Sequence, residues 1–111
     1  MKYTILINQA AVAEAGLHKT TDLVDWAILE YIHSWQTNPE ATRINGYVSL
    51  NYKRLIQEMP LLGLRTKQSV SGRIGKLRSL NLLESIRQEG AGGSLYVRTT
   101  PLFFDILLRG V

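Results

Sequence analysis

The sequence contains no cysteine, which excludes disulfide bonds and thiolate chemistry. This absence suits a reducing compartment, and we predict a cytoplasmic protein. No apolar run approaches the roughly 20 residues that a membrane-spanning helix needs, so we expect no membrane contact. The apolar run within the opening stretch, Met1–Gly16, is too short for a secretory signal, because Asn8 and Gln9 interrupt it. We therefore predict that it is part of the fold.

Side chains that support catalysis or metal binding are also scarce. His18 and His33 are the only histidines, and neither has a carboxylate at metal-ligand spacing. Phosphate-binding and nucleophile-elbow motifs are missing, and Ser69 and Ser71 lack a positioned base. We expect no enzyme activity, no metal, no cofactor and no small-molecule ligand.

Charge is unevenly distributed along the chain. Residues 1–42 contain two cationic and five acidic side chains, a net charge of −3, whereas residues 43–98 contain ten and three, a net charge of +7. Between Glu58 and Glu84 there are five cations and no acid. This asymmetry is typical of a polyanion-binding surface, although an ordinary solvated charged face would look the same.

Length and periodicity predict one α+β domain spanning residues 1–111, since 45% of its residues are apolar. Caps and breakers set the expected boundaries. In the first part of the chain we predict a strand at 3–7, a helix capped by Asn8 and ended by Gly16, and a helix capped by Thr20 or Thr21 and reaching Trp35. A loop at 37–46 and a strand at 47–50 should follow, and then a helix from Asn51 to about Met59 and a helix from its cap Thr66 to about Leu80. The last part should contain strands at 83–87 and 95–99 around a hairpin tip at 88–94, and a helix from Thr100-Pro101 to Gly110.

The helix predicted at 67–80 has an unusual outward face. A step of about 100° per residue from Val70 points five residues away from the apolar seam. They are Gln68, Ser71, Gly72, Gly75 and Ser79. Each glycine costs roughly 1 kcal/mol relative to alanine in a helix interior. Bare backbone could permit close approach to DNA, or surface glycines could simply be tolerated.

The order of elements over Asp22–Pro101 resembles a winged-helix DNA-binding domain. SVSGRIGKLRSLNLL (69–83) is similar to the recognition-helix signature of MarR-type regulators, except that Gly72 stands where arginine is common. Residues 47–64 and Thr100-Pro101-Leu102 resemble the winged-helix domains of phage and plasmid replication initiators. The resemblance implies a winged helix at 20–99, with a three-helix core, a short strand and a hairpin wing. An N-terminal extension (1–19) and a C-terminal helix (100–111) would flank it.

The same resemblance implies binding of double-stranded DNA, in transcription regulation or replication initiation of a phage, plasmid or bacterial chromosome. For base contacts we predict Gln68, Ser69, Ser71 and Arg73. For phosphate contacts we predict Lys67, Lys76, Arg78, Lys53 and Arg54. Arg65, Gly72 and the strand residues Arg87 and Arg98 complete the predicted DNA-binding set. With four to six phosphates neutralised, log K should fall against log[salt] with a slope of about −4 to −5.

The C-terminal helix suggests a second function, because six of the seven residues 102–108 are apolar. That is more than one face of a short helix buries in a small domain, which indicates a homodimer, a docking partner or a longer protein. Candidate contact residues are Trp26, Leu29, Phe103, Phe104 and Leu107, although Trp26 and Leu29 could instead pack against the N-terminal strand and helix. The alternative function is therefore a protein–protein interaction module without DNA binding.

Overall fold

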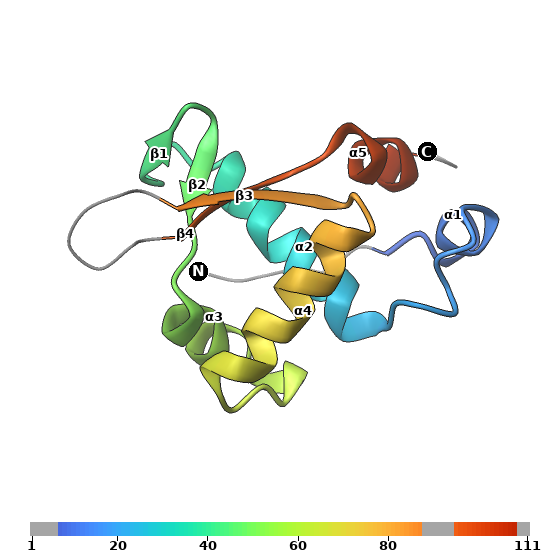
Figure 1. The fold of residues 1–111 in the computed structure, drawn as a ribbon, viewed down its shortest axis with the longest axis horizontal. Coiled ribbons are helices and arrows are strands. Elements are labelled where there is room, and N and C mark those ends of the chain that lie inside the picture. Colours follow the sequence, from blue (N-terminus) through green and yellow to red (C-terminus); the bar gives the residue numbers. More distant parts are fainter. Residues whose placement is uncertain (1–6, 88–94, 109–111) are drawn as a thin grey trace.

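The computed structural model describes residues 7–87 and 95–108, and within these ranges it is an α+β fold. Its five α-helices, one short 3-10 helix and four strands follow the predicted order closely (Figure 1). They are α1 (Gln9–Glu14), α2 (Leu23–Gln36), β1 (Arg43–Ile44), β2 (Tyr47–Ser49), α3 (Tyr52–Glu58), η1 (Pro60–Leu62), α4 (Lys67–Ser79), β3 (Leu83–Arg87), β4 (Leu95–Thr99) and α5 (Pro101–Leu108).

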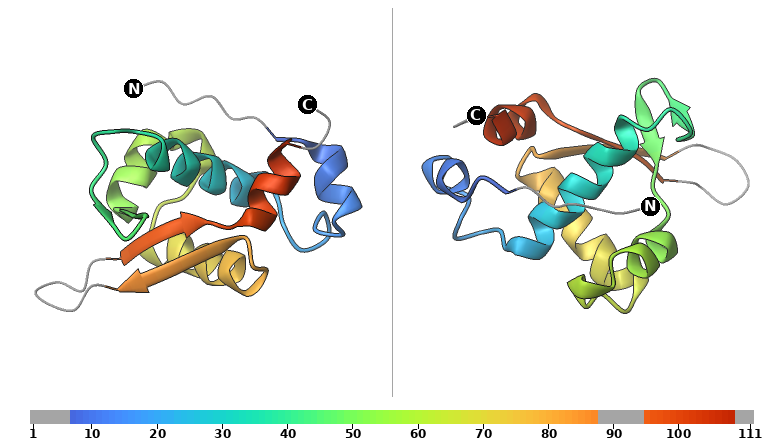
Figure 2. Two further views of the ribbon diagram at one scale, coloured as in Figure 1. Left: turned by 90° about the horizontal axis from the view of Figure 1, so that it is seen from above. Right: turned by 180° about the vertical axis from the view of Figure 1, so that it is seen from behind.

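The four strands form one antiparallel sheet in the order β1-β2-β4-β3. β3 and β4 pair along their whole length, from Leu83 opposite Thr99 to Arg87 opposite Leu95. Helix α2 packs against β4 and β2, whereas α4 packs against β3 and α3. Helix α4 also crosses α2, as Figure 1 and the right view of Figure 2 show. The sheet and α2 thus form the support on which α4 is held.

The core lies between α2, α4 and the sheet. The seam residues Val70, Ile74 and Leu77 of α4 are buried, as the i, i+4, i+7 spacing predicts. From the sheet, Val48 and Val97 are buried directly opposite each other on neighbouring strands. Burial of one stripe of α4 necessarily turns its opposite stripe to solvent.

Three predicted helix caps are confirmed. The side chains of Asn8, Asn51 and Thr66 each accept a hydrogen bond from the backbone N–H three residues later, at 3.0, 3.0 and 3.2 Å. Asn81 has a φ of 61°, so the predicted left-handed residue after α4 is also confirmed.

The predicted cap of α2 is wrong, because Asp22 takes this position instead of Thr20 or Thr21. Asp22 accepts a hydrogen bond from Asp25 N at 2.9 Å, and the side chain of Asp25 accepts one from Asp22 N. The hydroxyl of Thr21 is used elsewhere, since it accepts a 2.9 Å hydrogen bond from Trp26 Nε1.

The predicted loop at 37–46 contains a strand that the sequence analysis missed. β1 pairs with β2 across Asn45-Gly46, whose φ values of 53° and 83° suit a tight two-residue hairpin turn. The Asn-Gly pair was the available signal. Apart from Ile7, the strand predicted at 3–7 lies outside the described residues, as do the hairpin tip at 88–94 and Gly110.

Three of the candidate contact residues belong to the core, and for Trp26 and Leu29 this is the internal packing that was the alternative to a partner contact. Trp26, Leu29 and Phe103 are only 6%, 0% and 1% exposed. The rings of Trp26 and Phe103 stack with centroids 6.2 Å apart, because α5 folds back over α2 and alongside α1. Phe104 is 37% exposed, and the side chain of Leu107 lies outside the described part of the chain.

Among the helices that the structure describes, none combines the length and the apolar character needed to cross a bilayer.

Candidate nucleic-acid interface

The outward face of α4 has the predicted phase. The residues expected to point away from the core are all exposed, namely Gln68, Ser71, Gly72, Gly75 and Ser79. A Cβ atom added at Gly72 or Gly75 would meet no heavy atom within 4 Å, so the backbone is bare and open there. Approach to the middle of α4 is therefore limited by little more than its main chain.

Two serines of α4 direct their hydroxyls back to the helix. Ser69 Oγ donates to Thr66 O at 2.7 Å, and Ser79 Oγ donates to Gly75 O at 2.8 Å. Both groups are partly satisfied before any ligand arrives, which weakens the predicted role of Ser69 in base contacts.

Four exposed cations surround this face and form no ion pair with any residue in the described ranges 7–87 and 95–108. We call them the unpaired cations, and they are Lys53, Arg65, Lys67 and Arg78. Lys67 and Arg78 lie on α4 itself, Arg65 precedes its cap, and Lys53 lies on the neighbouring α3. Their positive charge is available to an external anion.

Two other predicted DNA contacts, Arg54 and Arg98, are each paired with an acidic side chain of the protein itself. Arg54 forms an ion pair with Glu58 at 2.7 Å, and its guanidinium lies 4.4 Å from the centre of the Trp35 ring.

Arg98 pairs with Glu84 across β4 and β3 at 3.0 Å and stacks 4.3 Å from the Tyr47 ring. The hydrogen bonds from Arg98 and Tyr47 hold the pKa of Glu84 below its usual value. Arg87 is exposed at the end of β3.

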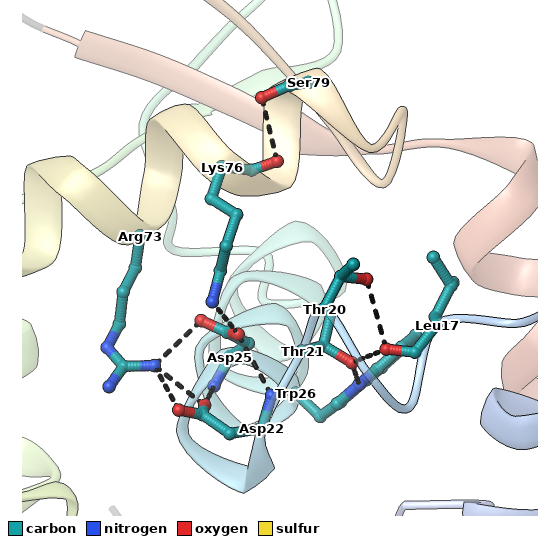
Figure 3. A network of polar contacts seen from close by, with 9 residues as sticks. All are labelled: Leu17, Thr20, Thr21, Asp22, Asp25, Trp26, Arg73, Lys76 and Ser79. Carbon is teal, nitrogen blue, oxygen red and sulfur yellow. Dashed lines mark hydrogen bonds and ion pairs between the residues drawn. The ribbon is translucent and has the colours of Figure 1, made fainter.

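A four-residue ionic network joins α4 to the start of α2 (Figure 3). Asp25 is completely buried, and its two carboxylate oxygens accept from Arg73 Nη1 at 2.9 Å and from Lys76 Nζ at 2.5 Å. Arg73 Nη1 also lies 2.7 Å from Asp22 Oδ1. Two acids and two cations therefore neutralise one another on the inner flank of α4.

The ionic network stabilises the charged forms of Asp22 and Arg73. Partial burial by itself would raise the pKa of Asp22, but the hydrogen bonds from Arg73 and Asp25 N, with the nearby cations, hold this pKa below its usual value. The hydrogen bond to Asp22 raises the pKa of Arg73. Both shifts favour the charged forms of Asp22 and Arg73 at neutral pH.

This network changes the picture of the site that the sequence alone suggested. Arg73 and Lys76 were predicted to contact a base and a phosphate, but both heads point toward α2 (Figure 3). The pairing of Asp22 and Asp25 with α4 was missed. No local signal could have revealed it, because Arg73 lies 51 and 48 residues from its partners.

Comparison with known proteins adds no relative: no protein-family model matches the chain, and no similar curated protein or solved structure was found.

Proposed function

We propose that this chain is a winged helix-turn-helix protein that binds double-stranded DNA through α4. The order of α2, β2, α3, α4, β3 and β4 supports the proposal, with η1 as the turn between the two helices and the β3–β4 hairpin as the wing. The role is in transcription regulation or in replication initiation of a phage, plasmid or bacterial chromosome.

The unpaired cations carry the proposal. Acidic side chains of the protein itself neutralise Arg73, Lys76, Arg54 and Arg98. The unpaired cations around the bare face of α4 have no acidic partner among the described residues. A major groove admits one helix, and its phosphates lie along both flanks of a helix seated there. Unpaired cations beside the exposed face and small residues at its centre suit this arrangement.

The N-terminus of α4 adds a second anion-binding element. Its cap Thr66 occupies one backbone N–H, that of Ser69, and the other N–H groups of the first turn remain available for a phosphate. Arg65 and Lys67 lie beside this end of the helix. A phosphate bound there would set the register of α4 on the duplex without reading sequence.

The test is salt-dependent binding to a random-sequence DNA duplex, measured by fluorescence anisotropy. Four unpaired cations predict that log K falls against log[salt] with a slope of about −3 to −4. This is shallower than the −4 to −5 expected from sequence, because Arg73, Lys76 and Arg54 are already paired. A slope near zero, or no binding at low salt, would exclude duplex DNA as the ligand.

A further inference from the structure

The outward face of α4 offers one long side chain that can hydrogen-bond to a base. Gln68 is exposed in the first turn of α4, the part of a groove-bound helix that reaches base edges. Its amide has both a donor and an acceptor, which matches adenine N7 and N6 in the major groove. No other residue of this face combines comparable length with two hydrogen-bonding groups.

The other candidates for reading bases are accounted for by their contacts. Arg73, the side chain suited to guanine, donates to Asp22 and Asp25 on the inner flank. Ser69 donates to the backbone of its own helix turn. Ser71 is exposed, but a serine hydroxyl serves as donor or acceptor to any base and discriminates little.

The cations on α4 are placed for the DNA backbone. Lys67 and Arg78 are eleven positions apart, which is close to three full turns, so they lie on the same flank. Their separation along the helix axis is about 16 Å. Two cations this far apart on one flank suit two non-adjacent phosphates, and phosphates contain no sequence information.

We infer that the protein binds duplex DNA with weak sequence preference and that Gln68 is the single base-reading side chain of α4, selecting adenine at one position. This inference rests on the proposed function and specifies its substrate as DNA of nearly any sequence. Gly72 is consistent with this inference, because an exposed glycine has no side chain that could contact a base.

The test is selection of duplexes from a random pool by the full chain, followed by titration of the enriched duplex and of a random duplex. One good bidentate contact predicts a preference of about 5- to 150-fold, concentrated at one A·T pair. Proteins that read several bases bind their sites roughly 10³ to 10⁷ times more tightly than random DNA.

Two variants of α4 separate reading from positioning. Gln68→Ala should bring the enriched and random duplexes to equal affinity while preserving the salt slope. Lys67→Ala should weaken binding to both duplexes alike and reduce the slope by about 1, because it removes a phosphate contact.

The outcomes distinguish this inference from the proposed function. A consensus over several positions, or a preference that survives Gln68→Ala, would overturn the inference and leave DNA binding intact. Binding without any preference would overturn Gln68 as a reader. Failure to bind any duplex at low salt would remove the proposed function itself.

Discussion

At the scale of single residues, Asp25 stands out because one buried carboxylate serves three donors. It accepts from Arg73 and Lys76 of α4 and from the backbone of Asp22. Asp25→Asn should lower the free energy of unfolding by about 2–3 kcal/mol, since hydrogen bonds to a charged group are lost at a buried site. Urea denaturation followed by circular dichroism measures this change.

Asp22→Asn is the matched control, because it changes the net charge equally and asparagine is an equally good helix cap. Asp22 is exposed, so its pair with Arg73 is worth about 1 kcal/mol or less. Equal destabilisation by the two variants would show that burial of Asp25 does not anchor α4.

The glycines of α4 allow a second test at this scale. Gly72→Ala and Gly75→Ala should each raise the free energy of unfolding by about 1 kcal/mol, because a methyl group enters open space and helix propensity improves. Gly63→Ala is the contrasting variant and should destabilise, since Gly63 has a φ of 69°. Weaker DNA binding by the α4 variants would favour close approach of the backbone, and unchanged binding would favour tolerance.

At the scale of elements, α5 contributes Phe103 and Ile106 to the core. Phe103 is 1% exposed and packs on Trp26 of α2, so Phe103→Ala should cost about 3–5 kcal/mol of stability. Phe104, at 37% exposed, should cost clearly less when replaced by alanine. Thermal denaturation with sedimentation of the same samples measures both effects.

This prediction concerns the buried side of α5 and is separate from the expected homodimer or partner contact. If Phe103→Ala altered the association state while leaving the melting temperature unchanged, the packing of α5 on α2 would be contradicted.

At the scale of the whole molecule, internal pairing decides which positive charges an external anion meets. Lys67→Ala with Arg78→Ala should reduce the magnitude of the salt slope by about 2, because both cations are unpaired. Arg98→Gln with Glu84→Gln is the control pair and should leave the slope unchanged, since those charges already neutralise each other. An equal effect of the two double variants would show that internal pairing does not select the binding surface.

Most elements of this fold could be predicted from the sequence because their determinants are local. Asn8, Asn51 and Thr66 cap the helices that follow them, and Asn81 takes the left-handed conformation after α4. The strands at 83–87 and 95–99 also lie where they were expected. β1 was missed because two residues are too few for a periodic pattern to appear.

The candidate site likewise combines features set by local sequence with features set by tertiary packing. The sequence by itself determined that α4 is a helix with an outward face of glycine, serine and Gln68, since the spacing of Val70, Ile74 and Leu77 sets that phase. Only the tertiary structure decided which cations remain available around that face. Arg73 and Lys76 are neutralised by acids about 50 residues away along the chain, and only the packing of α4 across α2 brings these groups within hydrogen-bonding distance.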